Sequence, residues 1–346
     1  MLSKDKPIII AGPCSAENEE IVFSTAKELC AIGVNSFRAG LWKPRTHPNA
    51  FEGVGELGFP WLQRVQRELG MKVSVEVACA KHVDLALKAG VDMLWIGART
   101  STNPFSVQEI ADTLKGVDIP VFIKNPINPE LELWIGAIER VANAGVKQIA
   151  AIHRGFSTYQ KHKYRNTPYW QLVVELTRRM PDLPIICDPS HIAGDRKYIE
   201  EIAQSALNMG FDGLMIESHI DPSCAKSDAA QQLKPSELSL LLDSLKYCKP
   251  AAESVDVQSK LEDLRLKIDE LDSELIQALA SRMSVVDKIG EIKKTENIAI
   301  FQPKRMEQIL SNAIEKGIAH GLSSEYIEKL FQLIHEESIN KQMGKN

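Results

Sequence analysis

The sequence predicts an α/β fold, a TIM (β/α)8 barrel, followed by an all-α domain of three helices. Two observations support this prediction. Apolar, β-rich runs alternate eight times with amphipathic helical stretches up to about residue 246, and no strand signal follows. Eight strand–helix units in roughly 240 residues agree with a TIM barrel in number and in size. A doubly wound open sheet is the structural alternative.

The expected strands are short apolar runs, and the helices between them carry apolar residues at three- and four-residue spacing. The strands are Pro7–Gly12, Val34–Ala39, Lys72–Val77, Asp92–Ile96, Pro120–Lys124, Lys147–Ile152, Pro184–Asp188 and Gly213–Glu217. The clearest helices are Ile21–Ile32, Trp61–Leu69, Leu131–Ala144, Tyr169–Met180, Tyr198–Met209 and Ser236–Leu245. Several of these helices are followed by a glycine, which is typical of helix C-termini.

The composition changes after residue 246. A segment with one proline, small residues and no periodicity follows, and such a composition is typical of a linker. We therefore expect a barrel domain at residues 1–246, a linker at 247–257 and a helical domain at 258–346.

The helical domain is expected to contain three helices. Apolar residues recur at helical spacing from Leu261 to Ile289, with charged residues between them. Pro303 is expected to open a second helix that ends near Gly317. Ser323 or Ser324 then caps a third helix that runs to about Gln342.

Composition and charge exclude several classes of protein. The net charge of −5 and a pI near 6.0 give no global basic footprint for nucleic acid, so any cationic chemistry must come from local clusters. The six cysteines have no short paired spacing, which suits a reducing cytoplasm better than a disulfide framework. No apolar signal segment precedes the first strand, and no apolar run reaches membrane-spanning length. We expect a cytoplasmic protein with no membrane or nucleic-acid partner.

Four residues with metal-binding side chains lie at or beyond the ends of expected strands. Cys14 follows the first strand, His191 the seventh, Glu217 ends the eighth, and Asp228 lies in the loop beyond. Strands seven, eight and one are neighbours in a closed barrel, so these ligands would converge on the rim where such barrels carry out chemistry. A thiolate, an imidazole and two carboxylates suit Mn²⁺, Fe²⁺, Co²⁺ or Zn²⁺ better than Ca²⁺ or Mg²⁺.

Basic residues follow the second, fourth, fifth and sixth strands on the same rim. Guanidinium groups hold oxyanions with paired hydrogen bonds, whereas lysine provides a point charge. The five residues are Arg38, Lys43, Arg99, Lys124 and Arg154. The rim is therefore expected to bind small anionic ligands.

Residues 5–246 resemble 3-deoxy-D-arabino-heptulosonate 7-phosphate (DAHP) synthase of the short class built on an unadorned barrel. The resemblance rests on motifs in family order, namely Gly12–Ser15, Lys43–Thr46, Ile96–Arg99, Arg154-Gly155 and Asp188–His191. It implies metal-dependent condensation of phosphoenolpyruvate with erythrose 4-phosphate, with Mn²⁺ as the first choice of metal. The metal would polarise the aldehyde oxygen of erythrose 4-phosphate.

The resemblance also implies roles for individual residues. The five basic residues would form the phosphoenolpyruvate cradle, and Arg45 and Thr46 would hold the second sugar phosphate or its hydroxyl groups. Glu76, near the end of the third strand, is the candidate for orienting the water that adds to the enol-derived carbon. An octulosonate 8-phosphate synthase, which uses arabinose 5-phosphate, is the alternative enzyme, and the segment Lys43–Thr46 argues against it.

The sequence departs from the DAHP synthase pattern at three places. His47 stands where serine is usual, Thr100–Thr102 replaces Asn-x-Gln, and Asn125-Pro126 stands where Arg-Gly is common. These changes affect the expected sugar-phosphate contacts, whereas the basic residues of the cradle are all present.

Residues 258–342 resemble the all-helical chorismate mutase, which converts chorismate to prephenate. This pericyclic step needs only a site that holds two carboxylates and stabilises charge on the breaking ether oxygen. The family's positions correspond to Arg265, Arg282, Lys293, Arg305, Ser338 and Gln342. Met306 and Gln302 replace the usual Glu and Asp, so reduced or altered mutase activity is an open alternative.

Arg265 and Arg282 are too far apart to share one site within a single helix. Their 17-residue separation (282 − 265) corresponds to about 25 Å at 1.5 Å per residue. The resemblance therefore implies an intertwined homodimer or higher homo-oligomer in which each site is completed by the partner's arginine. One alternative is a plain coiled dimerisation helix. Another is a non-catalytic domain that senses prephenate or chorismate and regulates the barrel.

Overall fold

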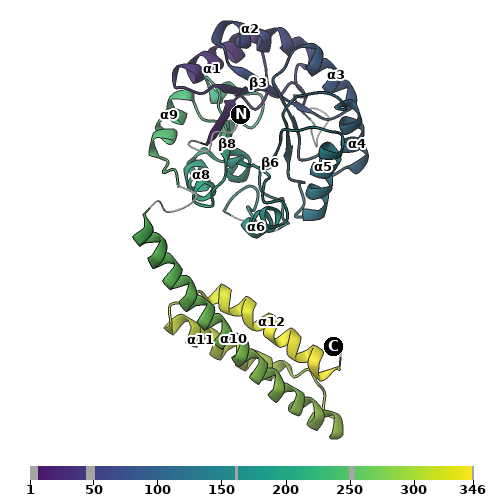
Figure 1. The fold of residues 1–346 in the computed structure, drawn as a ribbon, viewed down its shortest axis with the longest axis vertical. Coiled ribbons are helices and arrows are strands. Elements are labelled where there is room, and N and C mark those ends of the chain that lie inside the picture. The colour runs from purple at the N-terminus through teal and green to yellow at the C-terminus, as the bar shows by residue number, and fades with distance from the viewer. Residues whose placement is uncertain (1–6, 44–50, 160–162, 249–253, 345–346) are drawn as a thin grey trace. The chain divides into compact units, whose positions relative to one another are not determined.

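The computed structural model describes residues 7–43, 51–159, 163–248 and 254–344 of the chain. The chain divides into two compact units, Met1–Pro250 and Ala251–Asn346 (Figure 1). The predicted residues Arg45 and Thr46 lie outside the described residues.

The first unit is a closed barrel of eight parallel strands, as predicted, and the open-sheet alternative is wrong. Each strand pairs with its neighbours in sequence order, and β1 closes the barrel by pairing with β8, from Ile8 opposite Gly213 to Gly12 opposite Glu217. The strands are β1 Ile8–Gly12, β2 Ser36–Arg38, β3 Lys72–Val77, β4 Met93–Ile96, β5 Val121–Lys124, β6 Ile149–His153, β7 Ile185–Cys187 and β8 Gly213–Glu217.

Helices form the outer ring around the strands (Figure 1). They are α1 Glu19–Ala31, α2 Phe59–Leu69, α3 Ala80–Lys88, α4 Pro104–Thr113, α5 Leu131–Asn143, α6 Trp170–Arg179, α7 Pro189–Ala193, α8 Ile199–Asn208 and α9 Pro235–Ser244. Short 3₁₀ turns add η1 Gly55–Gly58, η2 Arg196–Tyr198, η3 Pro222–Cys224 and η4 Ala229–Gln231. No helix of the described residues, including the 41-residue α10, combines the length and apolar character needed to cross a membrane.

Apolar side chains pack on both faces of the strands, which explains why the strands read as continuous apolar runs. Ile10, Met93, Trp95, Ile152 and Met215 belong to a small buried cluster separate from the main core. The main core contains apolar residues of the strands together with those of the helices around them. The rim that carries the strand C-termini is thereby built on a rigid, well-packed base.

Strands β2 and β7 are shorter than their apolar runs suggest. β2 covers Ser36–Arg38 within the expected Val34–Ala39, and β7 covers Ile185–Cys187 within the expected Pro184–Asp188. The residue after each strand still donates a backbone hydrogen bond to the neighbouring strand, from Ala39 to Ser74 at 3.2 Å and from Asp188 to His153 at 2.7 Å. Asp188 is also the N-cap of α7.

Gly12 allows two strands to approach closely next to the site. Its φ is 149°, and a Cβ at this position would lie 2.1 Å from the carbonyl oxygen of Arg38. Any other residue would therefore push β1 away from β2. The chain leaves β1 at this point and turns toward Cys14.

The second unit contains three helices, as predicted. They are α10 Val255–Thr295, α11 Pro303–Ala319 and α12 Ser324–Gln342, and the Ser323 side chain caps α12 by accepting a hydrogen bond from the Tyr326 amide. The expected linker end at residue 257 needs correction, because α10 begins at Val255. Between Pro250 and Val255 the sequence contains no further proline and no glycine, so nothing there prevents the helix from starting before the first periodic leucine.

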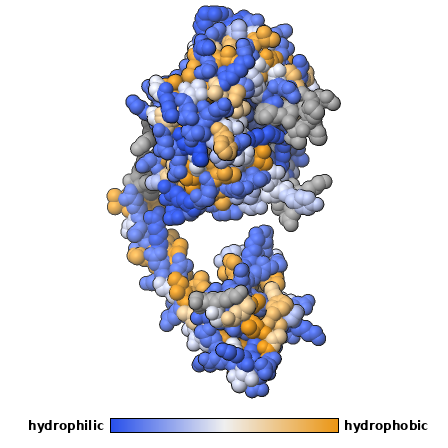
Figure 2. All heavy atoms as spheres, turned by 90° about the vertical axis from the view of Figure 1, so that its right-hand side faces the viewer, coloured by the Kyte–Doolittle hydropathy of each residue, from blue (hydrophilic) through white to orange (hydrophobic). Residues whose placement is uncertain are grey.

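Helix α10 exposes much of its apolar stripe. Val286 is its only buried residue among those described, whereas Leu264, Ile268 and Leu271 are more than half exposed, at 57%, 56% and 62%. Figure 2 shows apolar side chains on the surface of this unit. A stripe of this kind is typical of a helix that packs against a partner.

Candidate active sites

Three of the four predicted metal ligands form one tight cluster. The ligand atoms of Cys14, Glu217 and Asp228 all lie within 4.8 Å of one another, and the Cys14 thiol is 3.3 Å from Asp228 Oδ2. The pairing of Gly12 with Glu217 across β1 and β8 places the first two side by side. Cys14 and Glu217 are fully buried.

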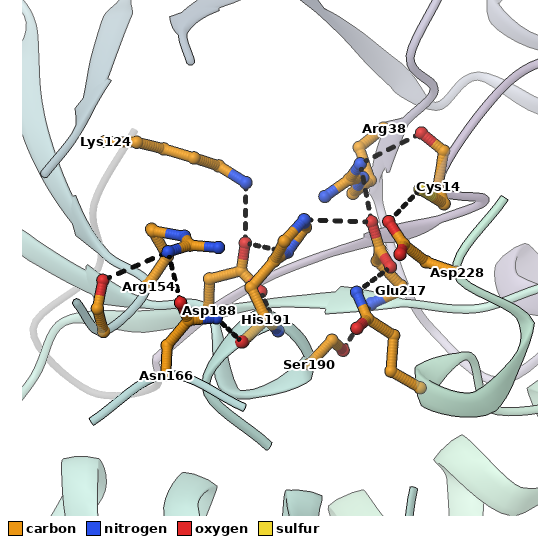
Figure 3. A network of polar contacts seen from close by, with 12 residues as sticks. Cys14, Arg38, Lys124, Arg154, Asn166, Asp188, Ser190, His191, Glu217 and Asp228 are labelled. Atoms are coloured by element: carbon orange, nitrogen blue, oxygen red, sulfur yellow. Dashed lines mark hydrogen bonds and ion pairs between the residues drawn. The ribbon is translucent and has the colours of Figure 1, made fainter. Parts of the chain in front are cut away.

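His191, the fourth predicted ligand, borders this cluster (Figure 3). Its Nε2 atom lies 3.7 Å from Glu217 Oε1, and its Nδ1 atom lies 2.8 Å from Asp188 Oδ2. Asp188 also accepts a hydrogen bond from the His191 amide at 3.1 Å, which fixes the start of α7. A carboxylate behind a metal-binding histidine orients the ring and leaves Nε2 for the ion.

The electrostatics of this cluster fit a divalent cation. Burial and the charge of Glu217 raise the pKa of Cys14 to about 12, so an ion must displace the thiol proton to bind here. Burial alone would raise the pKa values of Glu217 and Asp228. The charges of His191 and nearby cations outweigh this effect and hold both pKa values below their usual values. Glu217 Oε1 is buried and accepts no hydrogen bond from the described residues, although the Arg38 guanidinium lies 3.2 Å away as an ion pair. This oxygen is therefore suited to ligate an ion.

Basic side chains surround the cluster inside the barrel. Arg38 is fully buried, its Nη2 atom lies 3.2 Å from Glu217 Oε1, and its guanidinium stacks over the ring of Trp95 at 5.0 Å. The Nε and Nη1 atoms of Arg38 have no hydrogen-bond partner among the residues that the structure describes. The Lys43 ammonium donates to the carbonyl oxygen of Cys14 at 2.9 Å. Buried donors without partners indicate a place for an anionic ligand.

A second group of cations lies around Lys124 and Arg154 (Figure 3). Lys124 Nζ is 2.7 Å from Asp188 Oδ2, and Arg154 Nη1 donates to Asn166 Oδ1 at 2.9 Å. Burial, with Arg165 and Arg99 nearby, lowers the pKa of Arg154 to about 10. A buried guanidinium with other guanidinium groups nearby indicates a region of positive potential suited to a phosphate. Arg99 is exposed to solvent.

Glu76 lies among the same cations. It accepts a hydrogen bond from the Trp95 indole at 3.2 Å, and it is among the charges that act on Arg38, Lys43 and Lys124. A Cβ on Gly97 would lie 2.0 Å from Glu76 Oε1. The glycine of the Ile96–Arg99 motif therefore leaves the space that this carboxylate occupies.

In the helical unit, several of the predicted mutase residues meet between α10 and α12. Arg282 Nη1 donates to Ser338 Oγ at 2.6 Å, and Gln342 packs against Gly290, where a Cβ would lie 3.2 Å from its Cγ. Lys293 Nζ donates to the carbonyl oxygen of Ile300 at 2.6 Å. The Oε1 atom of Gln342 is buried without a partner.

Two predicted mutase residues lie outside this group within one chain. Within the described part of the chain, Arg265 pairs only with Glu262 on its own helix, at 3.4 Å, and Arg305 is exposed. Conversely, His335 belongs to the group but was not predicted. Its Nε2 atom is buried without a partner, and burial together with Arg282 and Lys293 lowers its pKa. The sequence signal that could have identified His335 is its position three residues before Ser338, which places both side chains on one face of the helix.

Family comparison agrees with the architecture of the barrel. The model of the DAHP synthetase I family matches residues 2–253, which is more than half of the chain. The chain belongs to the DAHP synthetase I family. Residues 264–343 match chorismate mutase type II, so this DAHP synthase carries a mutase domain at its C-terminal side.

Individual relatives agree with this assignment. A phospho-2-dehydro-3-deoxyheptonate aldolase of Thermotoga maritima is 32% identical over 250 residues, which cover 72% of this chain and 71% of that protein. A crystal structure of the DAHP synthase of this organism superposes with a TM-score of 0.62 at 32% identity, covering 68% of this chain and 67% of that one. A 2-dehydro-3-deoxyphosphooctonate aldolase of Magnetococcus marinus is 31% identical and covers 69% of this chain and 86% of that protein.

The protein is therefore a bifunctional enzyme. Its DAHP synthase domain condenses phosphoenolpyruvate with erythrose 4-phosphate, and its mutase domain rearranges chorismate to prephenate. The DAHP synthase family depends on a metal, and the cluster of Cys14, Glu217 and Asp228 fits this requirement.

Replacing Arg38 by methionine is expected to destabilise the DAHP synthase barrel by about 3 kcal/mol, because Glu217 would lose its closest buried cation. All five tryptophans, at positions 42, 61, 95, 134 and 170, lie in the barrel, so tryptophan fluorescence during urea unfolding reports on this unit alone. Arg64→Met, which removes surface ion pairs, is the matched control and should cost less than about 1 kcal/mol. Equal losses in both variants would contradict this prediction.

Proposed function

We propose that the DAHP synthase site holds one divalent transition metal between Cys14, His191, Glu217 and Asp228. Mn²⁺ is our first choice, and Fe²⁺, Co²⁺ and Zn²⁺ suit the same donors. The observation that carries the proposal is the convergence of three ligand atoms within 4.8 Å, with His191 Nε2 bordering Glu217 at 3.7 Å. When bound, the ion supplies a Lewis acid for the aldehyde oxygen of erythrose 4-phosphate.

The cations around this site are proposed to bind phosphoenolpyruvate. Arg38 and Lys43 lie beside the metal ligands, and Lys124, Arg154 and the exposed Arg99 extend the positive region outward. Such an arrangement neutralises both the carboxylate and the phosphate of one small substrate. A ligand carboxylate or phosphate would also give the free nitrogens of Arg38 hydrogen-bond partners.

The reaction follows from these positions. The enol carbon of phosphoenolpyruvate attacks the aldehyde carbon, water adds to the carbon that bore the phosphate ester, and inorganic phosphate leaves. Glu76 is proposed to orient that water, because it is the carboxylate that shares the barrel interior with Arg38, Lys43 and Lys124. Arg45 and Thr46 remain our candidates for the sugar phosphate.

The octulosonate alternative differs from the proposed synthase in its aldose phosphate, which would be arabinose 5-phosphate instead of erythrose 4-phosphate. The similarity to octonate aldolases shows that this barrel type also occurs in proteins of that name. The segment Lys43–Thr46, which carries the sequence argument for erythrose 4-phosphate, lies largely outside the described residues.

We propose that the mutase functions as a homodimer in the cytoplasm. Arg282, Lys293, Ser338 and Gln342 supply one half of each site, and Arg265 of the partner chain completes it, with Arg305 at its edge. Support comes from the exposed apolar stripe of α10 and from the absence of any link between Arg265 and Arg282 in the contacts of one chain. The cysteines of the chain are free thiols, which suits a reducing compartment.

The metal and the substrate are tested in one experiment. Protein stripped with a chelator is reloaded with Mn²⁺, Fe²⁺, Co²⁺ or Zn²⁺ and assayed with erythrose 4-phosphate and with arabinose 5-phosphate. We expect no condensation in the stripped protein and recovery with erythrose 4-phosphate, greatest with Mn²⁺. Full activity after stripping would overturn the metal proposal, and preference for arabinose 5-phosphate would overturn the substrate.

A further inference from the structure

Two consecutive glutamines lie behind the metal cluster and belong to none of the sequence motifs. Gln231 ends the short turn η4, and Gln232 follows it. Their exposed fractions are 1% and 0%. Side-chain amides at this depth must satisfy both a donor and an acceptor, so their partners determine what they do.

Gln231 joins the two carboxylates of the cluster through Arg165. Its Nε2 atom donates to Glu217 Oε2 at 2.7 Å, and its Oε1 atom accepts from Arg165 Nη1 at 2.9 Å. The same Nη1 atom donates to Asp228 Oδ1 at 2.9 Å. These partners fix the amide orientation, because its oxygen must face the guanidinium and its nitrogen the carboxylate. Three hydrogen bonds thus connect Glu217 to Asp228.

Gln232 joins two backbone segments of the cluster, the one that carries Cys14 and the one that precedes Asp228. Its Oε1 atom accepts from the Cys14 amide at 2.9 Å, and its Nε2 atom donates to the Ser227 carbonyl oxygen at 2.8 Å. The Ser227 hydroxyl is also 2.6 Å from the hydroxyl of Ser15. The backbone beside Asp228 and the backbone that carries Cys14 are therefore joined through one buried side chain.

The conformation of Asp228 indicates why such anchoring is needed. Its φ of 47° lies in the left-handed region, which a residue with a side chain adopts only when its surroundings hold it there. Asp228 and Glu217 are also like charges in close proximity, and they repel one another in the absence of a cation. The chain of hydrogen bonds through Gln231 and Arg165 opposes this repulsion from outside the cluster.

We propose that Gln231 and Arg165 are positioning residues that set the separation of Glu217 and Asp228 and thereby the affinity of the site for its ion. This inference rests on the proposed four-ligand metal site. Neither residue is one of the proposed ligands, and their side-chain hydrogen bonds go to ligand carboxylates or to each other. Loss of either residue should therefore weaken ion binding more than it weakens substrate binding.

The test is a titration of metal-stripped full-length protein with Mn²⁺, followed by electron paramagnetic resonance of the free ion. Gln231→Leu keeps much of the side-chain volume but removes both hydrogen bonds, and its dissociation constant should rise roughly 10- to 100-fold. Arg165→Leu should show a similar rise. The double variant should weaken binding by less than the product of the two factors, because both residues act through one chain of hydrogen bonds.

Two controls keep this inference separate from the metal proposal. Gln204→Leu removes a partly buried glutamine far from the cluster in sequence, which bonds Asn208 and the Lys246 carbonyl oxygen, and it should leave the dissociation constant unchanged. Cys14→Ser should weaken binding strongly. If Cys14→Ser leaves binding intact, the metal site itself is wrong. If Cys14→Ser weakens binding but Gln231→Leu and Arg165→Leu do not, the positioning role is wrong.

A further variant guards against misfolding. Arg165 has a half-exposed side chain, at 50%, so Arg165→Lys should preserve the barrel, which tryptophan fluorescence during urea unfolding would verify. Lysine keeps the positive charge near Asp228 but lacks the guanidinium fork, so binding should fall between that of the unaltered protein and that of Arg165→Leu. If Arg165→Lys keeps full affinity while Arg165→Leu loses it, Arg165 acts through its charge alone. That result would overturn the proposed chain of hydrogen bonds from Arg165 through Gln231 to Glu217.

Discussion

Replacing Cys14 by serine should lower the synthase rate by about three orders of magnitude and leave the mutase rate unchanged. A metal Lewis acid contributes several kcal/mol to transition-state stabilisation, and each ~1.4 kcal/mol corresponds to a factor of ten. Cys14 is the only thiol in the ligand cluster, and it is fully buried between Glu217 and Asp228. A hydroxyl in its place binds the same ions far more weakly. Both rates are measured on one preparation, with excess Mn²⁺ removed by gel filtration.

Cys224→Ser is the matched control for this variant. Cys224 is an exposed free thiol on the turn η3, and its replacement should change neither rate. The mutase rate of the Cys14→Ser protein shows that the second unit is intact, and the unfolding curve followed by tryptophan fluorescence shows the same for the barrel. A Cys14→Ser protein that retains full synthase activity after chelation would refute the assignment of this ligand.

Mixing two inactive mutase variants should restore activity. Arg265→Ala and Arg282→Ala should each lower the mutase rate by a factor of about 100 to 1,000, because each removes a cation that stabilises developing charge or holds a carboxylate. If Arg265 acts in the partner's site, a heterodimer of the two variants contains one site with both arginines and one site with neither. After subunit exchange, about a quarter of the unaltered activity should return, since half the dimers are mixed and half their sites are intact.

Subunit exchange itself must be shown, for example with two differently labelled chains. The control is a mixture of Arg282→Ala with a second preparation of Arg282→Ala, which should remain inactive under the same conditions. Exchange without recovery would refute the shared site. High activity of Arg265→Ala on its own would show that this arginine, which pairs only with Glu262 in one chain, has no role in the mutase.

The sequence predicts the barrel well because the relevant signals are local. Each strand is an apolar run, each helix has a regular apolar stripe, and their alternation leaves one rim for Cys14, Glu217 and Lys124. The same local signals fail at Gln231 and Gln232. Two glutamines in a loop carry no periodicity, and their partners, at positions 14 and 217 among others, come together only when β1 pairs with β8.

In the mutase domain, too, the sequence predicts what local spacing can show and misses what depends on the fold. Helical spacing places Ser338 and Gln342 on one face of a helix, and the resemblance to chorismate mutase adds Arg282 to the same site; the contacts between α10 and α12 agree. His335 was missed because its position three residues before Ser338 does not by itself distinguish a site histidine from one that only fills the helical stripe. Its burial beside Arg282 and Lys293, which lowers its pKa, appears only in the structure. The start of α10 at Val255 was not predicted, although Val257 lies four residues before Leu261 and extends the apolar spacing into the first turn.

The closure of β1 onto β8 determines when the metal centre can exist. Cys14 and Asp228 are 214 residues apart in the chain, so a ribosome must synthesise nearly the whole barrel before these two ligands can meet. Pairing of the first and last strands is among the most non-local contacts in the barrel and carries a large loop-closure entropy. An ion that binds only the closed barrel favours this last step by mass action. Metal supply would then influence how much of the newly made protein completes folding, in addition to its effect on catalysis.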